Sequence, residues 1–109
     1  MAKVVYWVTD LLFTSKIREV AKQLGVEAAA VRDVATLAAA APTAGLVIVD
    51  LRLPAALDAL AALESVAVTK VGFIDHERVD VMETARARGC RAYAKGAFAK
   101  ELPSLLAEL

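Results

Sequence analysis

Val49-Asp50-Leu51-Arg52-Leu53-Pro54 is the stretch that decides how this chain folds, because it closes the apolar run from Gly45 to Val49. Continuous runs of Val, Ile and Leu are typical of central strands in parallel sheets, whose two faces are both covered. Asp50 is therefore expected at the carboxyl end of such a strand. Open α/β sheets bind their ligands at that edge, so the sequence predicts a chemical role for this carboxylate.

The composition limits the class of protein. A chain of 109 residues is the size of one domain with one core, and we expect a single domain over residues 1–109. The 13 basic and 13 acidic residues are interspersed and give zero net charge, so binding of nucleic acid is not expected. No apolar run approaches the roughly 20 residues of a membrane span. The single cysteine, Cys90, fits a reducing cytoplasm.

Strand and helix signals alternate five times along the chain. Apolar, β-branched and aromatic residues predict strands at 4–8, 28–31, 46–49, 71–74 and 90–94. Apolar residues at helical spacing predict a helix after each strand. The first of these helices has a cap at Thr14 or Ser15, and the fourth begins at Asp75 or His76. Pro103 suits the first turn of the last helix.

The short connections determine the expected topology. Alternating strands and helices with right-handed crossovers predict an α/β fold, with one doubly wound parallel sheet flanked by five helices. The flavodoxin-like strand order 2-1-3-4-5 has its switch point between strands 1 and 3. Asp10 follows strand 1 and Asp50 ends strand 3. The two carboxylates are therefore expected to meet at the ligand crevice.

The string from Asp50 to Pro54 resembles the phosphoacceptor loop of response-regulator receiver domains, which reads Asp, hydrophobic, any residue, hydrophobic, Pro. The resemblance covers nearly the whole chain in element order. It implies that the Asp50 carboxylate attacks phosphorus and forms an acyl phosphate. It also implies Mg²⁺ as cofactor, held by Asp10, Asp50 and the backbone carbonyl of Arg52.

The chain departs from the receiver pattern at the acidic pair and at the hydroxyl position. The family has two acidic residues after the first strand, whereas here Thr9 precedes Asp10. After the fourth strand the family has a Ser or Thr. Ile74 stands there if no gap is allowed, and Asp75 if one is.

The lysine that contacts the phosphoryl group in receivers is displaced as well. Alignment through Phe98 places Gly96 at that position and leaves Lys95, the candidate phosphate contact, one residue early. A charge-assisted contact of this kind contributes about 1.5–3 kcal/mol. We therefore expect an atypical or pseudo-receiver that is poorly phosphorylated.

Two interpretations stay open for the side chain of Arg52. It is either a solvated surface arginine, whose ion pairs contribute little, or its guanidinium occupies the cavity that Mg²⁺ would fill and pairs with Asp50 or Asp10. The two aspartates have a plainer alternative as caps of the following turn or helix. His76 is expected on the surface, and Cys90 is expected as a small buried hydrophobic residue.

The function we expect is that of a stand-alone signalling module that acts by protein–protein interaction. Any enzyme activity would be limited to weak self-phosphorylation at Asp50. The alternative is a working single-domain response regulator, phosphorylated on Asp50 by a histidine kinase with Mg²⁺. The partner is either a signalling protein, such as a kinase or a downstream target, or a second copy of the chain. In receivers the fourth helix, fifth strand and fifth helix form the usual output face, which implies Tyr93 and Arg86 as interaction residues.

Overall fold

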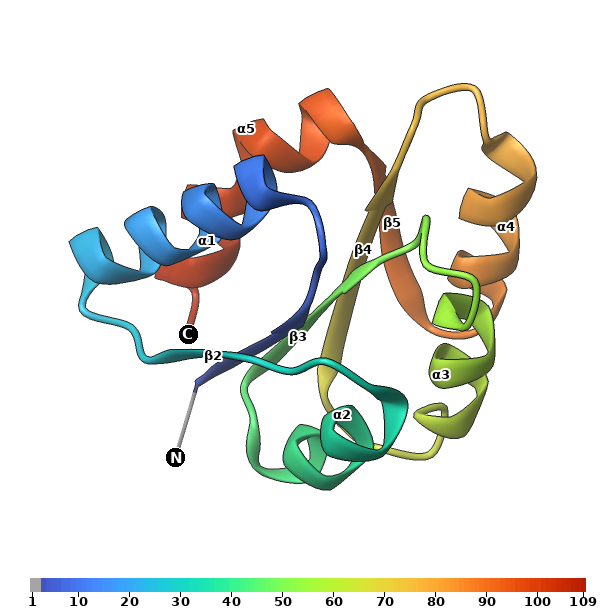
Figure 1. Ribbon diagram of the computed structural model, residues 1–109, viewed down its shortest axis with the longest axis horizontal. Helices are drawn as coiled ribbons and strands as arrows, with labels where there is room; N and C mark the ends of the chain where they lie inside the picture. Colours follow the sequence, from blue (N-terminus) through green and yellow to red (C-terminus); the bar gives the residue numbers. More distant parts are fainter. Residues whose placement is uncertain (1–2) are drawn as a thin grey trace.

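A single parallel sheet forms the centre of the protein. The computed structural model describes residues 3–109 (Figure 1). The five strands lie in the order β2-β1-β3-β4-β5, and every neighbouring pair is parallel. They are β1 (Val4–Trp7), β2 (Ala28–Ala30), β3 (Leu46–Asp50), β4 (Thr69–Ile74) and β5 (Cys90–Ala94). The predicted strand order and pairing are confirmed.

Helices cover both faces of this sheet. They are α1 (Leu11–Leu24), α2 (Val34–Ala40), the short 3-10 helix η1 (Ala41–Thr43), α3 (Ala56–Ala62), α4 (Val79–Ala87) and α5 (Lys95–Ala107). Figure 1 shows α1 and α5 on one face, and α2, α3 and α4 on the other. The doubly wound α/β fold with five flanking α-helices is therefore confirmed. None of the helices within residues 3–109 is long and apolar enough to cross a membrane.

The central strand β3 shows why its sequence is a continuous apolar run. Leu46 and Ile48 pack into the layer beneath α1 and α5, together with a stack of three aromatic rings from Phe13, Phe73 and Phe98. Val47 and Val49 pack into the opposite layer, beneath α2, α3 and α4. Each of these β3 side chains is fully buried, and such burial stabilises the fold by about 1.5–3 kcal/mol per side chain.

The start of α1 differs from the sequence prediction. Asp10, and not Thr14 or Ser15, is the N-cap. Its Oδ1 accepts hydrogen bonds from the backbone N–H groups of Leu12 and Phe13 at 2.9 and 3.2 Å. The helix therefore begins at Leu11, before Thr14 and Ser15, because the Asp10 carboxylate satisfies backbone N–H groups of the first turn that have no partner within the helix.

The starts of α4 and α5 also differ from prediction. Asp75 and His76 belong to a turn in which the Arg78 N–H donates to the Asp75 carbonyl at 3.0 Å, and α4 begins only at Val79. α5 begins directly after β5, so Pro103 lies in its interior and not in its first turn. Proline and capping patterns locate a helix, but they leave its first residue uncertain by several positions.

Candidate functional site

Asp50 is a buried carboxylate at the carboxyl end of β3. Its side chain is 1% exposed, and a buried charge requires hydrogen-bond partners of opposite charge. Arg52 supplies them from two residues along the chain. Asp50 Oδ1 accepts from the Arg52 backbone N–H at 3.0 Å and from Nε at 3.1 Å, and Oδ2 accepts from Nη2 at 3.1 Å. Both carboxylate oxygens are therefore bonded to Arg52.

The same guanidinium also reaches Asp10. Arg52 Nη2 donates to Asp10 Oδ2 at 2.9 Å, while the other oxygen of Asp10 caps α1. The structure thus brings the two carboxylates together, as the strand order predicted, around one guanidinium nitrogen. Of the two interpretations of Arg52, the one in which it pairs with the aspartates describes the structure. Asp10 also caps α1, as its plainer alternative proposed.

The charges at this crevice stabilise one another. The backbone N–H of Phe13 and the guanidinium of Arg52 hold the pKa of Asp10 below its usual value. The hydrogen bonds to Asp50 raise the pKa of Arg52 above that of a free arginine, so its guanidinium stays charged throughout the physiological range. Two carboxylates against one guanidinium leave the crevice with one net negative charge.

The Mg²⁺ site that receiver domains imply does not fit this arrangement. Mg²⁺ requires near-octahedral oxygen ligands at about 2.0–2.1 Å. Both oxygens of Asp50 and one of Asp10 are already bonded to Arg52. Within residues 3–109, no group of three or more His, Cys, Asp or Glu side chains converges so that it could hold a metal ion. The side chains as arranged bind a guanidinium and not a hydrated divalent ion.

Lys95, the predicted phosphate contact, forms an ion pair with the carboxylate of Asp75. Its Nζ lies 3.3 Å from Asp75 Oδ1. Asp75 follows β4, and Lys95 follows β5, which is the neighbouring strand. Gly96, which stands where receivers have their lysine, is exposed. Either Ile74 or Asp75 stands at the hydroxyl position of receivers, depending on whether a gap is allowed, and the sequence did not predict this ion pair. The adjacency of the two strand ends was the signal that could have found it.

The predicted interaction residues lie where α4 meets β5. Tyr93 is half-buried in β5. Arg86 is an exposed residue of α4, and its Nη2 donates to the backbone carbonyl of Ala92 at 2.8 Å. Arg86 therefore also ties α4 to the edge strand, which the sequence did not predict. His76 is exposed and Cys90 is buried, as expected.

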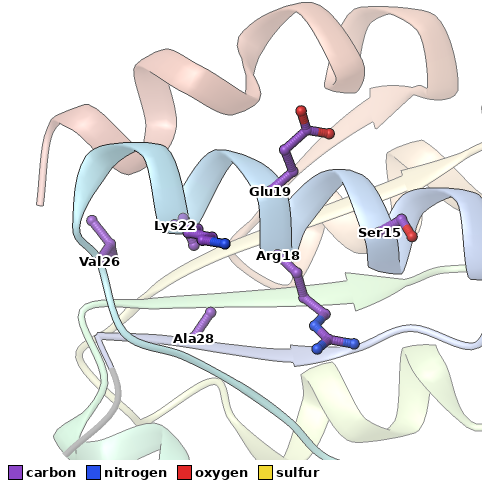
Figure 2. A pocket seen from close by; sticks show the side chains of 7 residues that line it. Ser15, Arg18, Glu19, Lys22, Val26 and Ala28 are labelled. Carbon is purple, nitrogen blue, oxygen red and sulfur yellow. The ribbon is translucent and has the colours of Figure 1, made fainter.

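The surface hollows of residues 3–109 include one beside Arg52 and one beside α1. The first, of about 270 Å³, is lined by apolar side chains and by the charged side chains of Arg52, Asp75 and Arg78. Its lining residues are Leu51, Arg52, Leu53, Pro54, Leu57, Ile74, Asp75, Arg78 and Val81. A larger open hollow of about 540 Å³ lies between α1 and β2 (Figure 2). The side chains of Arg18 and Glu19 at this second hollow point in different directions, so they do not converge on one ligand (Figure 2).

Comparison with known proteins places the fold. No family model matches the sequence, and neither does any curated protein. A response regulator receiver domain from Rhodospirillum rubrum is similar in structure, with a TM-score of 0.71 and 20% identity, over 96% of this chain and 91% of that chain. A response regulator from Colwellia psychrerythraea has a TM-score of 0.69 and 13% identity, over 100% of both chains. The chain therefore has the fold of response-regulator receiver domains over nearly its whole length.

Proposed function

We propose that this protein is a receiver-like signalling module that acts by binding another protein, with weak or no phosphorylation of Asp50. The observation that carries this proposal is the ion pair between Lys95 and Asp75. Lys95 carries the ammonium group nearest in sequence to the phosphate-binding position of receivers, and this ammonium group is paired with Asp75. The residue at that position itself, Gly96, has no side chain to replace it.

The charge balance of the crevice argues in the same direction. A phosphoryl group would add about −1.5 to −2 charges to a site that already carries one net negative charge. Asp75 adds a further carboxylate at or next to the position where receivers have a hydroxyl, and Thr9 gives no second acidic ligand for a metal. Loss of two charge-assisted contacts, at about 1.5–3 kcal/mol each, would slow phosphorylation by roughly two to four orders of magnitude.

The surface proposed for partner binding combines α4, β5 and α5. Tyr93 offers a half-buried aromatic ring, and exposed charged residues of both signs occur on α4 and α5. An aromatic anchor within a polar rim is the usual pattern of a modest protein–protein interface. The proposed partner is a signalling protein or a second copy of the chain.

One experiment tests the phosphorylation part of the proposal. The protein is incubated with acetyl phosphate and Mg²⁺, and its intact mass is measured, with Asp50→Asn as the control variant. We expect no stoichiometric gain of a phosphoryl group. A stoichiometric gain that disappears in Asp50→Asn would instead support a working response regulator that receives phosphate from a histidine kinase.

The second arm of the experiment tests the interaction face. Tyr93→Ala and Arg86→Glu are compared with wild type in affinity capture from the native host, and Arg18→Glu on α1 is the matched control. We expect the first two variants to lose partner or self-association while the control keeps it. Circular dichroism must show that all variants fold, because Arg86 also bonds to β5. Full binding by both variants, with loss in a variant near Asp50, would place the interface at the crevice.

A further inference from the structure

We propose that Arg52 is the resident cation of the crevice and that its guanidinium excludes Mg²⁺ from the two carboxylates. The inference concerns the same crevice as the proposed function, but it requires neither a partner nor a phosphoryl donor. In receivers the residue at this position binds the metal through its backbone carbonyl. The inference gives a role to the side chain of Arg52 as well.

The contacts of Arg52 are those of a bound cation and not of a mobile surface side chain. Its Nε and Nη2 bond to the two oxygens of Asp50, each at 3.1 Å, and Nη2 also bonds to Asp10 at 2.9 Å. The planar fork of a guanidinium matches a carboxylate at two points, which a lysine ammonium cannot do. The side chain is 33% exposed, so the remainder of it is packed into the crevice.

Guanidinium and Mg²⁺ cannot share this site. Mg²⁺ would coordinate oxygens of Asp50 and Asp10 at about 2.0–2.1 Å. Arg52 Nη2 already lies 2.9 and 3.1 Å from one oxygen of each carboxylate. An ion placed between the same oxygens would overlap or strongly repel the guanidinium. Entry of the metal therefore requires all three side-chain hydrogen bonds of Arg52 to break.

The fold holds Arg52 ready for this role. The backbone N–H of Arg52 bonds to Asp50 at 3.0 Å and so fixes the turn that follows β3. Leu51, between them, is buried and packs against Gly72 of β4. Only two peptide bonds separate Arg52 from Asp50. The guanidinium therefore binds the Asp50 carboxylate intramolecularly, whereas Mg²⁺ must bind from solution.

The test compares metal binding by wild type with that by Arg52→Ala and Arg52→Gln, and Arg91→Ala is the matched control. Arg91 is an exposed arginine of β5. Binding of Mg²⁺ is measured by titration calorimetry and by the shift in Tm. We expect both Arg52 variants to bind Mg²⁺ with an apparent Kd at least about tenfold lower than that of wild type. Mg²⁺ should raise Tm in these two variants and leave Tm of wild type and Arg91→Ala unchanged.

A second readout locates the metal. In NMR spectra of Arg52→Gln, Mn²⁺ should broaden the amide signals of Leu12 and Leu53, which flank the two carboxylates. The double variant Asp50→Asn/Arg52→Gln should lose both the broadening and the gain in affinity. The glutamine variant keeps a polar side chain, so the test stands even if Arg52→Ala fails to fold.

Three results would overturn the inference. They are binding of Mg²⁺ by wild type as tight as by the Arg52 variants, no gain of binding in either variant, and a gain that persists when Asp50 is also replaced. None of these results depends on phosphorylation. A wild-type protein that binds Mg²⁺ but is not phosphorylated would overturn this inference alone. Stoichiometric phosphorylation of Asp50 would overturn the proposed function, and the metal-binding comparison would still decide the role of Arg52.

Discussion

Replacement of Gly72 by alanine should destabilise the protein through a clash beside the crevice. Gly72 lies in β4, where it is paired with Val49 of β3 and Ala92 of β5. A Cβ at Gly72 would lie 2.7 Å from Cγ of Leu51 and 2.9 Å from both of its Cδ atoms. Ordinary van der Waals contacts of this kind lie at 3.4–4 Å. Leu51 is buried and therefore cannot swing into solvent to relieve the contact.

The expected magnitude follows from two opposing effects. Overpacking of a core costs about 1–3 kcal/mol, and we place the clash with the branch carbon of Leu51 near the middle of that range. Replacing glycine with alanine recovers about 0.4–1 kcal/mol by restricting the unfolded chain. We expect a net loss of about 1–2 kcal/mol in the free energy of unfolding. That loss corresponds to a fall in Tm of roughly 4–16 °C for a domain of this size.

Urea denaturation of a double-mutant cycle measures this effect. Leu51→Ala alone should cost about 2–5 kcal/mol because it leaves a cavity. In Gly72→Ala/Leu51→Ala the new methyl group fills part of that cavity, so the double variant should lose less than the two single variants together. The prediction is wrong if Gly72→Ala is as stable as wild type and the double variant loses as much as Leu51→Ala alone. In that case Leu51 does not clash with a methyl group at position 72.

Two further predictions use the pKa shifts. The Phe13 N–H and Arg52 lower the pKa of Asp10. The charged carboxylate therefore stabilises the fold at pH values above 3.8, the ordinary pKa of an aspartate. This stabilisation is lost as the pH falls through the lowered pKa. In urea denaturation, wild type should exceed Asp10→Asn in stability at pH 6, and the difference should shrink below about pH 4; a constant difference would contradict the assignment. Burial raises the pKa of the Cys90 thiol to about 12, so a thiol reagent at pH 8 should label the folded protein far more slowly than the urea-unfolded chain; equal rates would show that β5 opens readily.

The sequence alone was sufficient for the architecture and for the meeting of the two carboxylates. Five alternations of strand and helix with short connections leave few topologies, because crossovers are right-handed and sequential elements pack side by side. Asp10 and Asp50 follow strands that this order makes neighbours, so their approach is a consequence of topology. The covered faces of β3 likewise followed from an unbroken apolar run.

The partners of the charged side chains were decided only by the tertiary structure. Hydrophobic periodicity reports which face of an element is buried, but it does not report where a long flexible side chain ends. Arg52 had two open interpretations until β1 and β3 placed Asp10 and Asp50 within reach of one guanidinium. Lys95 was expected near the phosphate position, yet the turn after β4 brings Asp75 to its ammonium group. Such pairings depend on the relative positions of loops from different strands, and those positions are fixed only when the core packs.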